Sequence, residues 1–311
     1  MAVRHFTSRN KANPDQLLKT EPQVQIKDMI SGERQFISLE FFPPKERGEW
    51  PQFFSTAERL RSVNPLFASV TYGAGGGTGN DTVEIVGRLS REHGMETMAH
   101  LTCVGAENCA IQKFLDELLA VDVHNVLALR GDLPKEKTGN HVNTPLLHAS
   151  DLVAFIRSSH PETGVAVAGY PETHPEADSP ERDIEFLRLK IDKGADFIIT
   201  QLFFDNRLYH DFVRRARAAG VTKPIIPGIL PVVSLKVINR IVSLCGATIP
   251  PEFMAQLEEA DQSGGSSAVQ KTGIDFARKQ AADLLASGVP GVHLYTLNRA
   301  EAVLEIADGL L

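Results

Sequence analysis

The stretch FISLEFFPP, residues 36–44, decides the fold, because it is a continuous apolar run that ends in a carboxylate and is stopped by two prolines. Apolar runs of this length are typical of strands that are buried on both faces of a parallel sheet. Seven similar runs follow along the chain, and most of them end in polar residues. The predicted strands cover residues 36–42, 66–74, 96–104, 125–132, 164–171, 197–205, 224–231 and 291–298.

Between these strands lie longer stretches in which apolar residues recur every three or four positions, as in 56–63 and 114–121, and this spacing predicts helices. Strands that alternate with helices pair in parallel, since each crossover needs a dozen or more residues. Eight such units predict an α/β fold, a closed (β/α)8 TIM barrel with its active site at the carboxyl ends of the strands. The residues at those ends are Glu40, Thr71, Tyr72, His100, Arg130, Gly131, Asp132, Tyr170, Gln201 and Tyr295.

Composition limits the class of protein. The 311 residues are 42% hydrophobic and carry a formal net charge of −7, so one barrel domain can account for nearly all of the chain. The acidic balance argues against a nucleic-acid partner, which would require a basic face, and no apolar run reaches the length of a membrane span. Cys103, Cys109 and Cys245 have neither metal-ligand spacing nor an even count. With a polar N-terminal segment that lacks the apolar region of a secretory signal, they favour a cytoplasmic location.

The chain divides into an N-terminal arm and a single catalytic barrel. We expect residues 1–30 to form the arm, flexible over 1–23 and with room for a short helix before the first strand. Residues 31–311 are expected to form the barrel. Within the barrel, the long polar segment 133–145 follows a strand end, so we expect a loop over the site there.

A second interruption, residues 232–290, is predicted to hold extra helices before the last strand. These helices are expected over residues 234–245, after Pro250 and Pro251, and over 268–286. The glycine- and serine-rich residues 262–267 predict a flexible joint between the last two.

Glu40 is the first candidate for chemistry. A carboxylate between apolar residues at a strand end is partly desolvated, which predicts a pKa raised toward that of a usable general acid. The alternative is a structural ion pair with a lysine inside the barrel mouth.

The glycine run 73–79 after the second strand matches neither G-x-G-x-x-G nor G-x-x-x-x-G-K-[ST]. We interpret it as a mobile loop that lets a ligand approach the backbone. This argues against a Rossmann domain but not against a dinucleotide.

Four further strand ends offer groups that bind flat, polar ligands. Arg130 can hold an anionic or carbonyl-rich ring, and Asp132 can accept from an amino-pyrimidine edge or stabilise a cation. The proline-stiffened loop 168–177 offers an aromatic ring, an imidazole and two acids, which favours stacking on a planar cofactor. Gln201 is an amide that needs hydrogen-bond partners when buried, and Arg299 either holds an anion or caps a helix.

A metal site is the competing interpretation of the same residues. His174 could bind a metal with His100 and an acid, but no H-x-x-x-H or H-x-H pair supports it, so we predict none.

Taken together, eight motifs resemble those of methylenetetrahydrofolate reductases, and they occur in that family's order from about residue 35 to the end. The length resembles that of the catalytic barrel alone, without the regulatory domain of longer members. The motifs are LEFFPPK at 39–45, SVTYGAGGG at 69–77, HLTCVG at 100–105, LALRGDLP at 127–134, AGYPETHPEA at 168–177, ITQLFFD at 199–205, IIPGILPV at 225–232 and HLYTLNRAE at 293–301.

The resemblance implies a flavoprotein that reduces 5,10-methylenetetrahydrofolate to 5-methyltetrahydrofolate by ping-pong hydride transfer from NADH or NADPH through FAD. Glu40 matches the general acid of the family, and Asp132 matches an acid that contacts both pterin and flavin. Gln201 and Arg299 match folate-binding positions. The positions that match flavin contacts are Thr71, Tyr72, Ala74, His100, Arg130, Gly131, Asp132, Ala149, Tyr170, His174, Ala177, Asp183 and Lys190. The family also implies a homo-oligomer.

Four residues depart from the family pattern. Phe186 and Leu189 are apolar where some bacterial members carry polar groups near the adenosine end of FAD. Val237 and Ile241 stand where some members have a glutamine and a phenylalanine near folate or nicotinamide. These departures put FAD affinity and the nicotinamide position in question more than the chemistry.

Three other functions are compatible with the sequence. A metal-dependent hydrolase or aldolase would use Glu40, Asp132, His100 and His174. A folate- or flavin-binding protein would keep the pocket without turnover, although retention of a buried acid argues against it. A flavin-free reductase would transfer hydride directly. The sequence does not distinguish NADH from NADPH.

Overall fold

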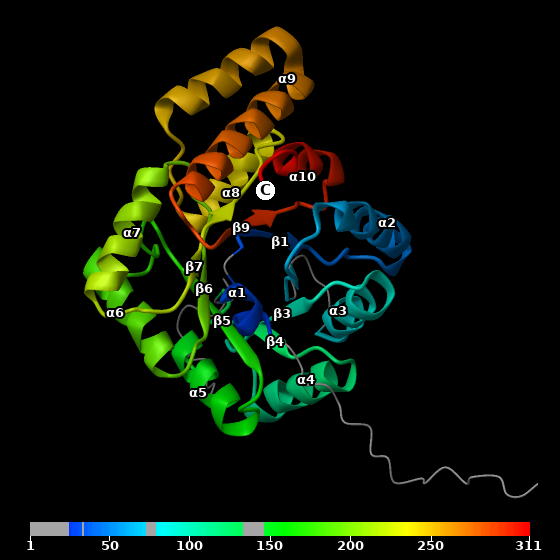
Figure 1. Ribbon diagram of the computed structural model, residues 1–311, viewed down its shortest axis with the longest axis vertical. Coiled ribbons are helices and arrows are strands. Elements are labelled where there is room, and N and C mark those ends of the chain that lie inside the picture. The colour runs from blue at the N-terminus through cyan, green and yellow to red at the C-terminus, as the bar shows by residue number, and fades with distance from the viewer. Residues whose placement is uncertain (1–24, 33, 73–78, 133–145) are drawn as a thin grey trace, which may run out of the picture.

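The computed structural model describes residues 25–32, 34–72, 79–132 and 146–311. Its strands form one parallel sheet in the order β7-β6-β5-β4-β3-β2-β1-β9-β8, surrounded by helices (Figure 1). The strands are β1 Phe36–Phe41, β2 Ala68–Val70, β3 Thr97–Thr102, β4 Asn125–Leu129, β5 Gly164–Gly169, β6 Phe197–Thr200, β7 Ile225–Ile226, β8 Gly228–Ile229 and β9 Gly291–Tyr295. The α-helices are α1 Ile26–Ile30, α2 Trp50–Leu60, α3 Gly79–His93, α4 Asn108–Ala120, α5 Ala149–Ser159, α6 Pro180–Asp192, α7 Asn206–Ala218, α8 Leu235–Cys245, α9 Pro251–Ala286 and α10 Ala300–Ala307, with short 3-10 turns η1 Arg47–Glu49 and η2 Arg61–Val63.

The predicted barrel is confirmed, with one correction at its closure. The single strand expected over 224–231 is divided at Pro227 into β7, which pairs with β6, and β8, which pairs with β9. Proline has no N–H to donate and a fixed φ, so it cannot continue a ladder on both sides. Its carbonyl still accepts from His293 N at 2.9 Å. The two halves therefore join the first and last parts of the sheet and close the barrel.

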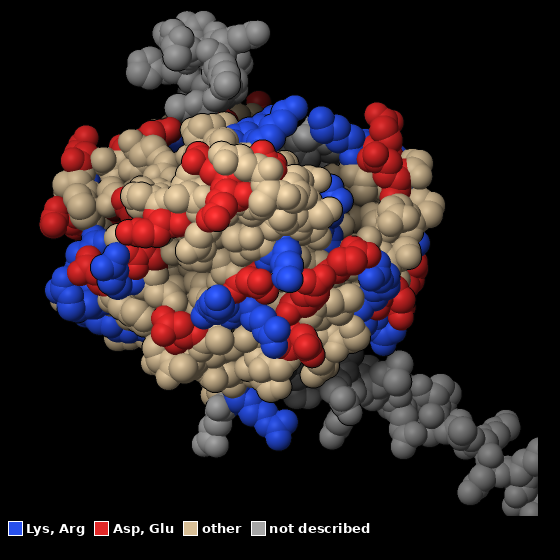
Figure 2. Space-filling model, turned by 90° about the horizontal axis from the view of Figure 1, so that it is seen from above, with Lys and Arg blue, Asp and Glu red and all other residues tan. Residues whose placement is uncertain are grey.

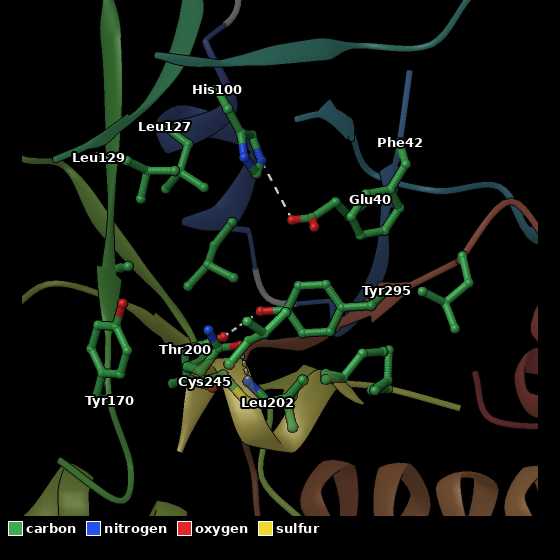
Figure 3. Close-up of a pocket in the computed structure, with 17 residues that line it drawn as sticks. Glu40, Phe42, His100, Leu127, Leu129, Tyr170, Thr200, Leu202, Cys245 and Tyr295 are labelled. Carbon is green, nitrogen blue, oxygen red and sulfur yellow. Dashed lines mark hydrogen bonds and ion pairs between the residues drawn. The ribbon is translucent and has the colours of Figure 1, made fainter. Parts of the chain in front are cut away.

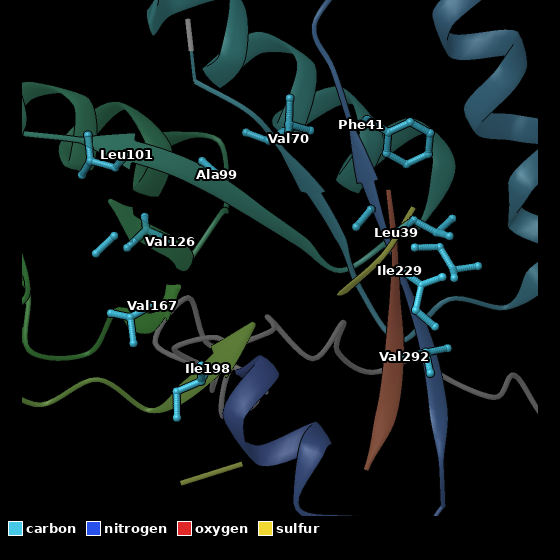
Figure 4. Packing of buried hydrophobic residues seen from close by; sticks show 14 of the residues in the cluster. Leu39, Phe41, Val70, Ala99, Leu101, Val126, Val167, Ile198, Ile229 and Val292 are labelled. Carbon is cyan, nitrogen blue, oxygen red and sulfur yellow. The ribbon is translucent and has the colours of Figure 1, made fainter. Parts of the chain in front are cut away.

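Side chains alternate between the inside and the outside of the barrel, as the pleat requires. On β1, Ile37, Leu39 and Phe41 belong to the outer core between strands and helices. Figure 4 shows this layer, with Leu39 and Phe41 beside residues from the neighbouring strands. Phe36, Ser38 and Glu40 occupy the alternate positions, so β1 changes from apolar to acidic along its inner face.

The amino-terminal end of the barrel interior is apolar and closed by α1. Ile26 and Ile30 of α1 pack with Phe36, Phe67 and Phe197 in a separate buried cluster. The short helix expected before the first strand is therefore present, and the described part of the expected arm, residues 25–30, packs against the barrel. Residues 1–24 lie outside the described residues.

The extra helices expected before the last strand are also present, but the joint between two of them differs from expectation. Residues 262–267, predicted as a flexible joint, are helical apart from Gly265, whose φ of 60° and ψ of −153° break α9. Glycine adopts this backbone at little steric cost. The chain turns back there, so that the two arms of α9 project together from the barrel (Figure 1).

Within the described residues, no helix is both long and apolar enough to cross a membrane. The face seen in Figure 2 carries acidic and basic side chains intermixed among uncharged ones.

Candidate active site

A cavity of about 430 Å³ opens at the carboxyl ends of the strands, where the sequence predicts the site. Its walls are mainly apolar, and its polar groups come from β1, β3, β5, β6 and β9 and the residues that follow them. Figure 3 shows Glu40 and His100 on one wall and Tyr170 on another. The lining residues are Glu40, Phe42, His100, Leu127, Leu129, Ala168, Tyr170, Ile199, Thr200, Gln201, Leu202, Leu230, Ile241, Leu244, Cys245, Tyr295 and Leu297.

Glu40 is buried beside two imidazoles. Its Oε2 lies 3.4 Å from His100 Nε2 and 3.4 Å from His293 Nε2. The His100 contact is an electrostatic one, because its orientation leaves Nε2 without a hydrogen-bond partner among the described residues. The alternative of an ion pair between Glu40 and a lysine is thus replaced by a carboxyl–imidazole cluster.

Barrel closure supplies the second imidazole, which sequence reasoning missed. β1 pairs with β9 so that Ser38 lies opposite His293 and Glu40 opposite Tyr295. His293 is fully buried, and its Nδ1 lies 2.9 Å from Ser38 Oγ. The sequence signal was the period of two, because Ser38 precedes Glu40 and His293 precedes Tyr295 on the same inward face.

The pKa expected for Glu40 was wrong in direction. Burial does raise it, but the charge of His100 and the hydrogen bond and charge of His293 outweigh burial and lower the pKa to about 2. The strands that carry these imidazoles therefore decide the direction of the shift.

Tyr170, His174, Asp183 and Lys190 come together beside the cavity. Helix α6 begins at Ser179, whose side chain accepts from Arg182 N, followed by Pro180 in the first turn. Asp183 and Lys190 lie two turns apart on one face of it. Asp183 accepts from His174 N at 3.0 Å, and Lys190 Nζ donates to Ala168 O at 2.6 Å.

Burial sets the electrostatics of this group. It lowers the pKa of Lys190 to about 8 against the opposing effect of Asp183, and it raises the pKa of Tyr170 to about 12. Burial also lowers the pKa of His174, whose ring lies 4.6 Å from that of Tyr170 in an edge-on arrangement.

Arg130 and Gly131 follow β4 at the same end of the barrel. Arg130 Nη2 donates to Glu176 Oε1 at 2.9 Å, and this pair raises the arginine pKa. Gly131 has a φ of +87°, and an added Cβ would lie 2.9 Å from Val104 Cγ1, so glycine is required there. Asp132, the next residue, is exposed.

The remaining residues that match flavin contacts of the family lie in different surroundings. Thr71 is buried at the end of β2, and its Oγ1 has no hydrogen-bond partner among the described residues. Tyr72 packs its ring edge-on against Phe114 of α4 at 5.3 Å. Ala149 begins α5, and Ala177 N donates to His174 O at 2.9 Å. Ala74 lies outside the described residues.

Gln201 and Arg299 differ in their relation to the cavity. Gln201 lines it, and its Oε1 accepts from Leu202 N at 2.8 Å. Its Nε2 is the group available to a ligand. Tyr295, opposite, fixes its hydroxyl by donating to Thr200 O at 2.7 Å. Arg299 is exposed and is the N-cap residue of α10.

The four departures from the family pattern fall on two helices. Phe186 and Leu189 are exposed on α6, and Arg182 stacks over the Phe186 ring at 4.7 Å. Val237 is exposed on α8, whereas Ile241 lines the cavity.

Across the described parts of the chain, no group of three His, Cys, Asp or Glu side chains is arranged to hold a metal ion. The metal-dependent hydrolase therefore finds no ligand set among these residues.

The fold and the mouth together define a (β/α)8-barrel protein with a buried acid–imidazole cluster beside an apolar cavity. The sequence model of one family, methylenetetrahydrofolate reductase, matches residues 25–310. The chain belongs to the methylenetetrahydrofolate reductase family.

Two relatives illustrate the extent of the match. Methylenetetrahydrofolate reductase (NADH) 1 from Arabidopsis thaliana is 38% identical over 297 residues, which cover 92% of this chain and 50% of the plant protein. The chain thus spans about half the length of that relative. The 5,10-methylenetetrahydrofolate reductase of Escherichia coli is 36% identical over 301 residues, covering 97% of this chain and 95% of the bacterial protein.

Among solved structures, an uncharacterised protein from Clostridium thermocellum that binds two copies of 5-methyl-5,6,7,8-tetrahydrofolic acid has a TM-score of 0.63 and 16% identity, covering 91% of this chain and 96% of that one. Tryptophan synthase from M. tuberculosis has a TM-score of 0.51 at 13% identity, covering 92% and 96%. At these identities the likeness supports the barrel fold alone.

Proposed function

We propose that this protein reduces 5,10-methylenetetrahydrofolate to 5-methyltetrahydrofolate with electrons from NADH or NADPH, using FAD as cofactor and Glu40 as general acid. The observation that carries the proposal is the position of Glu40, a buried carboxyl at the wall of the cavity and 3.4 Å from two imidazoles. Membership of the family supports the substrate and the reaction.

The cluster of Glu40, His100 and His293 can supply the proton that the reaction requires first. Opening the imidazolidine ring of the substrate needs a proton on a ring nitrogen, and the resulting iminium cation then accepts hydride. The cluster of Glu40, His100 and His293 can hold a proton beside the cavity, and we propose that this proton reaches the substrate through the Glu40 carboxyl. Because Ser38 holds His293 Nδ1, the other ring nitrogen stays directed at Glu40.

The residues beside the cavity fit FAD. Thr71 Oγ1 is a buried hydroxyl that lacks a partner among the described residues, and Arg130 and Lys190 are cations suited to carbonyl or phosphate oxygens. FAD, when bound, would supply the hydride carrier between nicotinamide and folate in a ping-pong reaction.

The proposed substrate contacts come from residues at the same end of the barrel. We propose that Gln201 donates its amide to the pterin and that Arg299 holds the folate carboxylates as an exposed cation. Asp132 would stabilise the iminium charge and contact the flavin. We also propose that residues 31–311 act as the catalytic barrel of a cytoplasmic homo-oligomer.

The test separates the two half-reactions. Under anaerobic conditions, NADH or NADPH should bleach the flavin band of the purified protein, and methylenetetrahydrofolate should restore it. In Glu40→Gln the bleaching should continue at a similar rate, while folate-dependent recovery should fall by about a thousandfold, within the range for a lost general acid. Glu46→Gln, an exposed glutamate shortly after β1, should leave both steps unchanged.

Three results would count against the proposal. Recovery of Glu40→Gln at the wild-type rate would remove Glu40 as the acid. A colourless protein that still reduces methylenetetrahydrofolate would favour the flavin-free reductase, for which exposed Phe186 and Leu189 are the relevant observation. A flavin that folate cannot reoxidise would favour a binding protein without turnover.

A further inference from the structure

The loop 170–177, between β5 and α6, reaches across the barrel mouth to the segment after α8. We propose that Glu172 in this loop is a positioning residue that holds α8 over the cavity and so sets how tightly the folate fits. The proposal rests on the proposed function for the identity of that ligand. Both carboxylate oxygens of Glu172 lie 3.0 Å from Thr248 N, three residues beyond the end of α8. A carboxylate that accepts from a backbone N–H makes a charge-assisted bond.

A second contact joins the same two segments. Gly246 caps the C-terminal end of α8; it has a φ of +74° and donates its N–H to Val242 O at 2.9 Å. A Cβ added to Gly246 would lie 3.0 Å from Pro175 Cγ. The end of α8 therefore packs directly on the loop that carries Glu172.

The loop is itself firmly anchored, so it can serve as a fixed support. His174 N donates to Asp183 of α6, and Glu176 N donates to His174 Nδ1 at 3.0 Å. Thr173 has a φ of 83°, a left-handed conformation that is costly for a β-branched residue. This conformation lies between Glu172, which reaches toward Thr248, and His174, which is held to α6.

Helix α8, in contrast, is lightly packed and forms one wall of the cavity. Ile238 is its only fully buried residue, and Leu244 is 71% exposed although it lines the cavity. Ile241 and Cys245 line the same wall, and Figure 3 shows Cys245 on the side of the cavity away from His100 and Glu40. A helix with little buried surface depends on its end contacts for its position.

Because α8 and Glu40 lie on different walls of the cavity, we expect a change at α8 to affect folate binding and not the chemical step. Loosening α8 should weaken the fit of folate without moving Glu40, which is fixed by β1 and β9. Glu172→Ala should therefore raise KM for methylenetetrahydrofolate about tenfold and leave kcat within about twofold. Glu172→Gln keeps an oxygen that accepts from Thr248 N and should restore most of the affinity. Asp178→Ala, an exposed acid just beyond the loop, is the matched control.

The thiol of Cys245 gives a readout that does not depend on activity. In a Cys109→Ser background, which removes the exposed cysteine, modification of Cys245 by dithiobis(nitrobenzoate) should be at least about fivefold faster in Glu172→Ala than in wild type. Buried Cys103 should stay protected, which separates local release of α8 from general unfolding.

Unchanged Cys245 reactivity in Glu172→Ala would overturn the positioning role, as would a fall in kcat at constant KM. A Glu172→Gln variant as reactive as Glu172→Ala would also contradict it. If the wild-type protein did not reduce methylenetetrahydrofolate, the proposed function would fail, while the thiol measurement would still decide whether Glu172 holds α8.

Discussion

Two glutamates lie at opposite ends of the same barrel, and their pKa values are shifted in opposite directions. Glu40, at the mouth, has its pKa lowered to about 2 by His100 and His293, against the effect of burial. Glu96, just before β3 at the other end, has its pKa raised to about 7 by burial and by the charge of Asp122. Burial raises both values, so the neighbours decide the sign. The direction of the pKa shift of a buried carboxyl therefore depends on the side chains that the strands bring beside it.

The surroundings of the two ends differ in the same way. The closed end is filled by aromatic and aliphatic side chains and covered by α1, and Asn125 links Glu96 to that helix by donating to Glu96 Oε1 at 2.7 Å and accepting from Ile26 N at 3.2 Å. The mouth holds the apolar cavity beside the carboxyl–imidazole cluster. We infer that the closed end provides stability and the mouth provides chemistry, as is general for this architecture.

The largest effect should come from the closed end. Phe197 is fully buried there, with its ring 6.0 Å from that of Phe67. Phe197→Ala removes a large side chain from a packed interior and should lower the free energy of unfolding by about 4 kcal/mol. Urea unfolding followed by fluorescence or circular dichroism would measure this loss.

Phe186→Ala is the matched control, because Phe186 is exposed on α6. It should change the free energy of unfolding by less than about 1 kcal/mol. The division between the two ends would fail if Phe197→Ala kept its stability and lost the folate half-reaction instead.

A smaller effect should come from Glu96, and its sign follows from linkage. Because the folded-state pKa lies above the ordinary value, the folded protein keeps a proton between pH 4.5 and about 7 that the unfolded chain has lost. The contribution of Glu96 to the free energy of unfolding is therefore greatest below pH 4.5 and is lost as the pH rises through about 7. Glu96→Gln should remove this loss and stabilise the protein at pH 8 by about 2 kcal/mol, a value reduced to allow for partial exposure.

Glu162→Gln, an exposed glutamate just before β5, is the control and should leave the pH dependence unchanged. Equal stabilisation by Glu96→Gln at pH 5 and pH 8 would show that ionisation of Glu96 does not carry the effect.

Local sequence predicted the fold and the place of the site well. Buried parallel strands are apolar throughout, so the run 36–42 and its successors could be recognised without tertiary information. Glu40 and Gln201 could be identified as candidate site residues because each is a polar residue at the end of such an apolar run, where the barrel opens. Ile241 stood out only by comparison with the family, because a half-exposed aliphatic residue on a helix is common.

What local sequence could not supply is the partner of each group. His293 meets Ser38 and Glu40 because β9 pairs with β1 across more than 250 positions, a register set by closure of the whole barrel. The pKa of Glu40 depends on that register, and this is why its predicted direction was wrong. Glu172 and Thr248 likewise meet only after α8 has packed across the mouth.

The smallest effect is expected from His293→Gln, which would make the surroundings of Glu40 more like those of Glu96. His293→Gln replaces one of the two imidazoles beside Glu40 with a neutral amide, so burial should act with less opposition and the pKa of Glu40 should rise. The variant also loses one of the two groups that can return a proton to Glu40, and we expect the folate half-reaction to slow by about tenfold. The pH above which that rate declines should move upward, because Glu40 would keep its proton longer. Stopped-flow reoxidation of the flavin across pH would measure both changes.

Ser38→Ala tests whether the charge of His293 or only its position matters. It keeps the imidazole but removes the oxygen 2.9 Å from His293 Nδ1 that orients the ring, so the pH at which the rate declines should move upward by less than in His293→Gln. A downward shift in His293→Gln would mean that the imidazole does not lower the pKa of Glu40. In that case the difference between the two glutamates would arise from His100 and solvent rather than from the β1–β9 pairing.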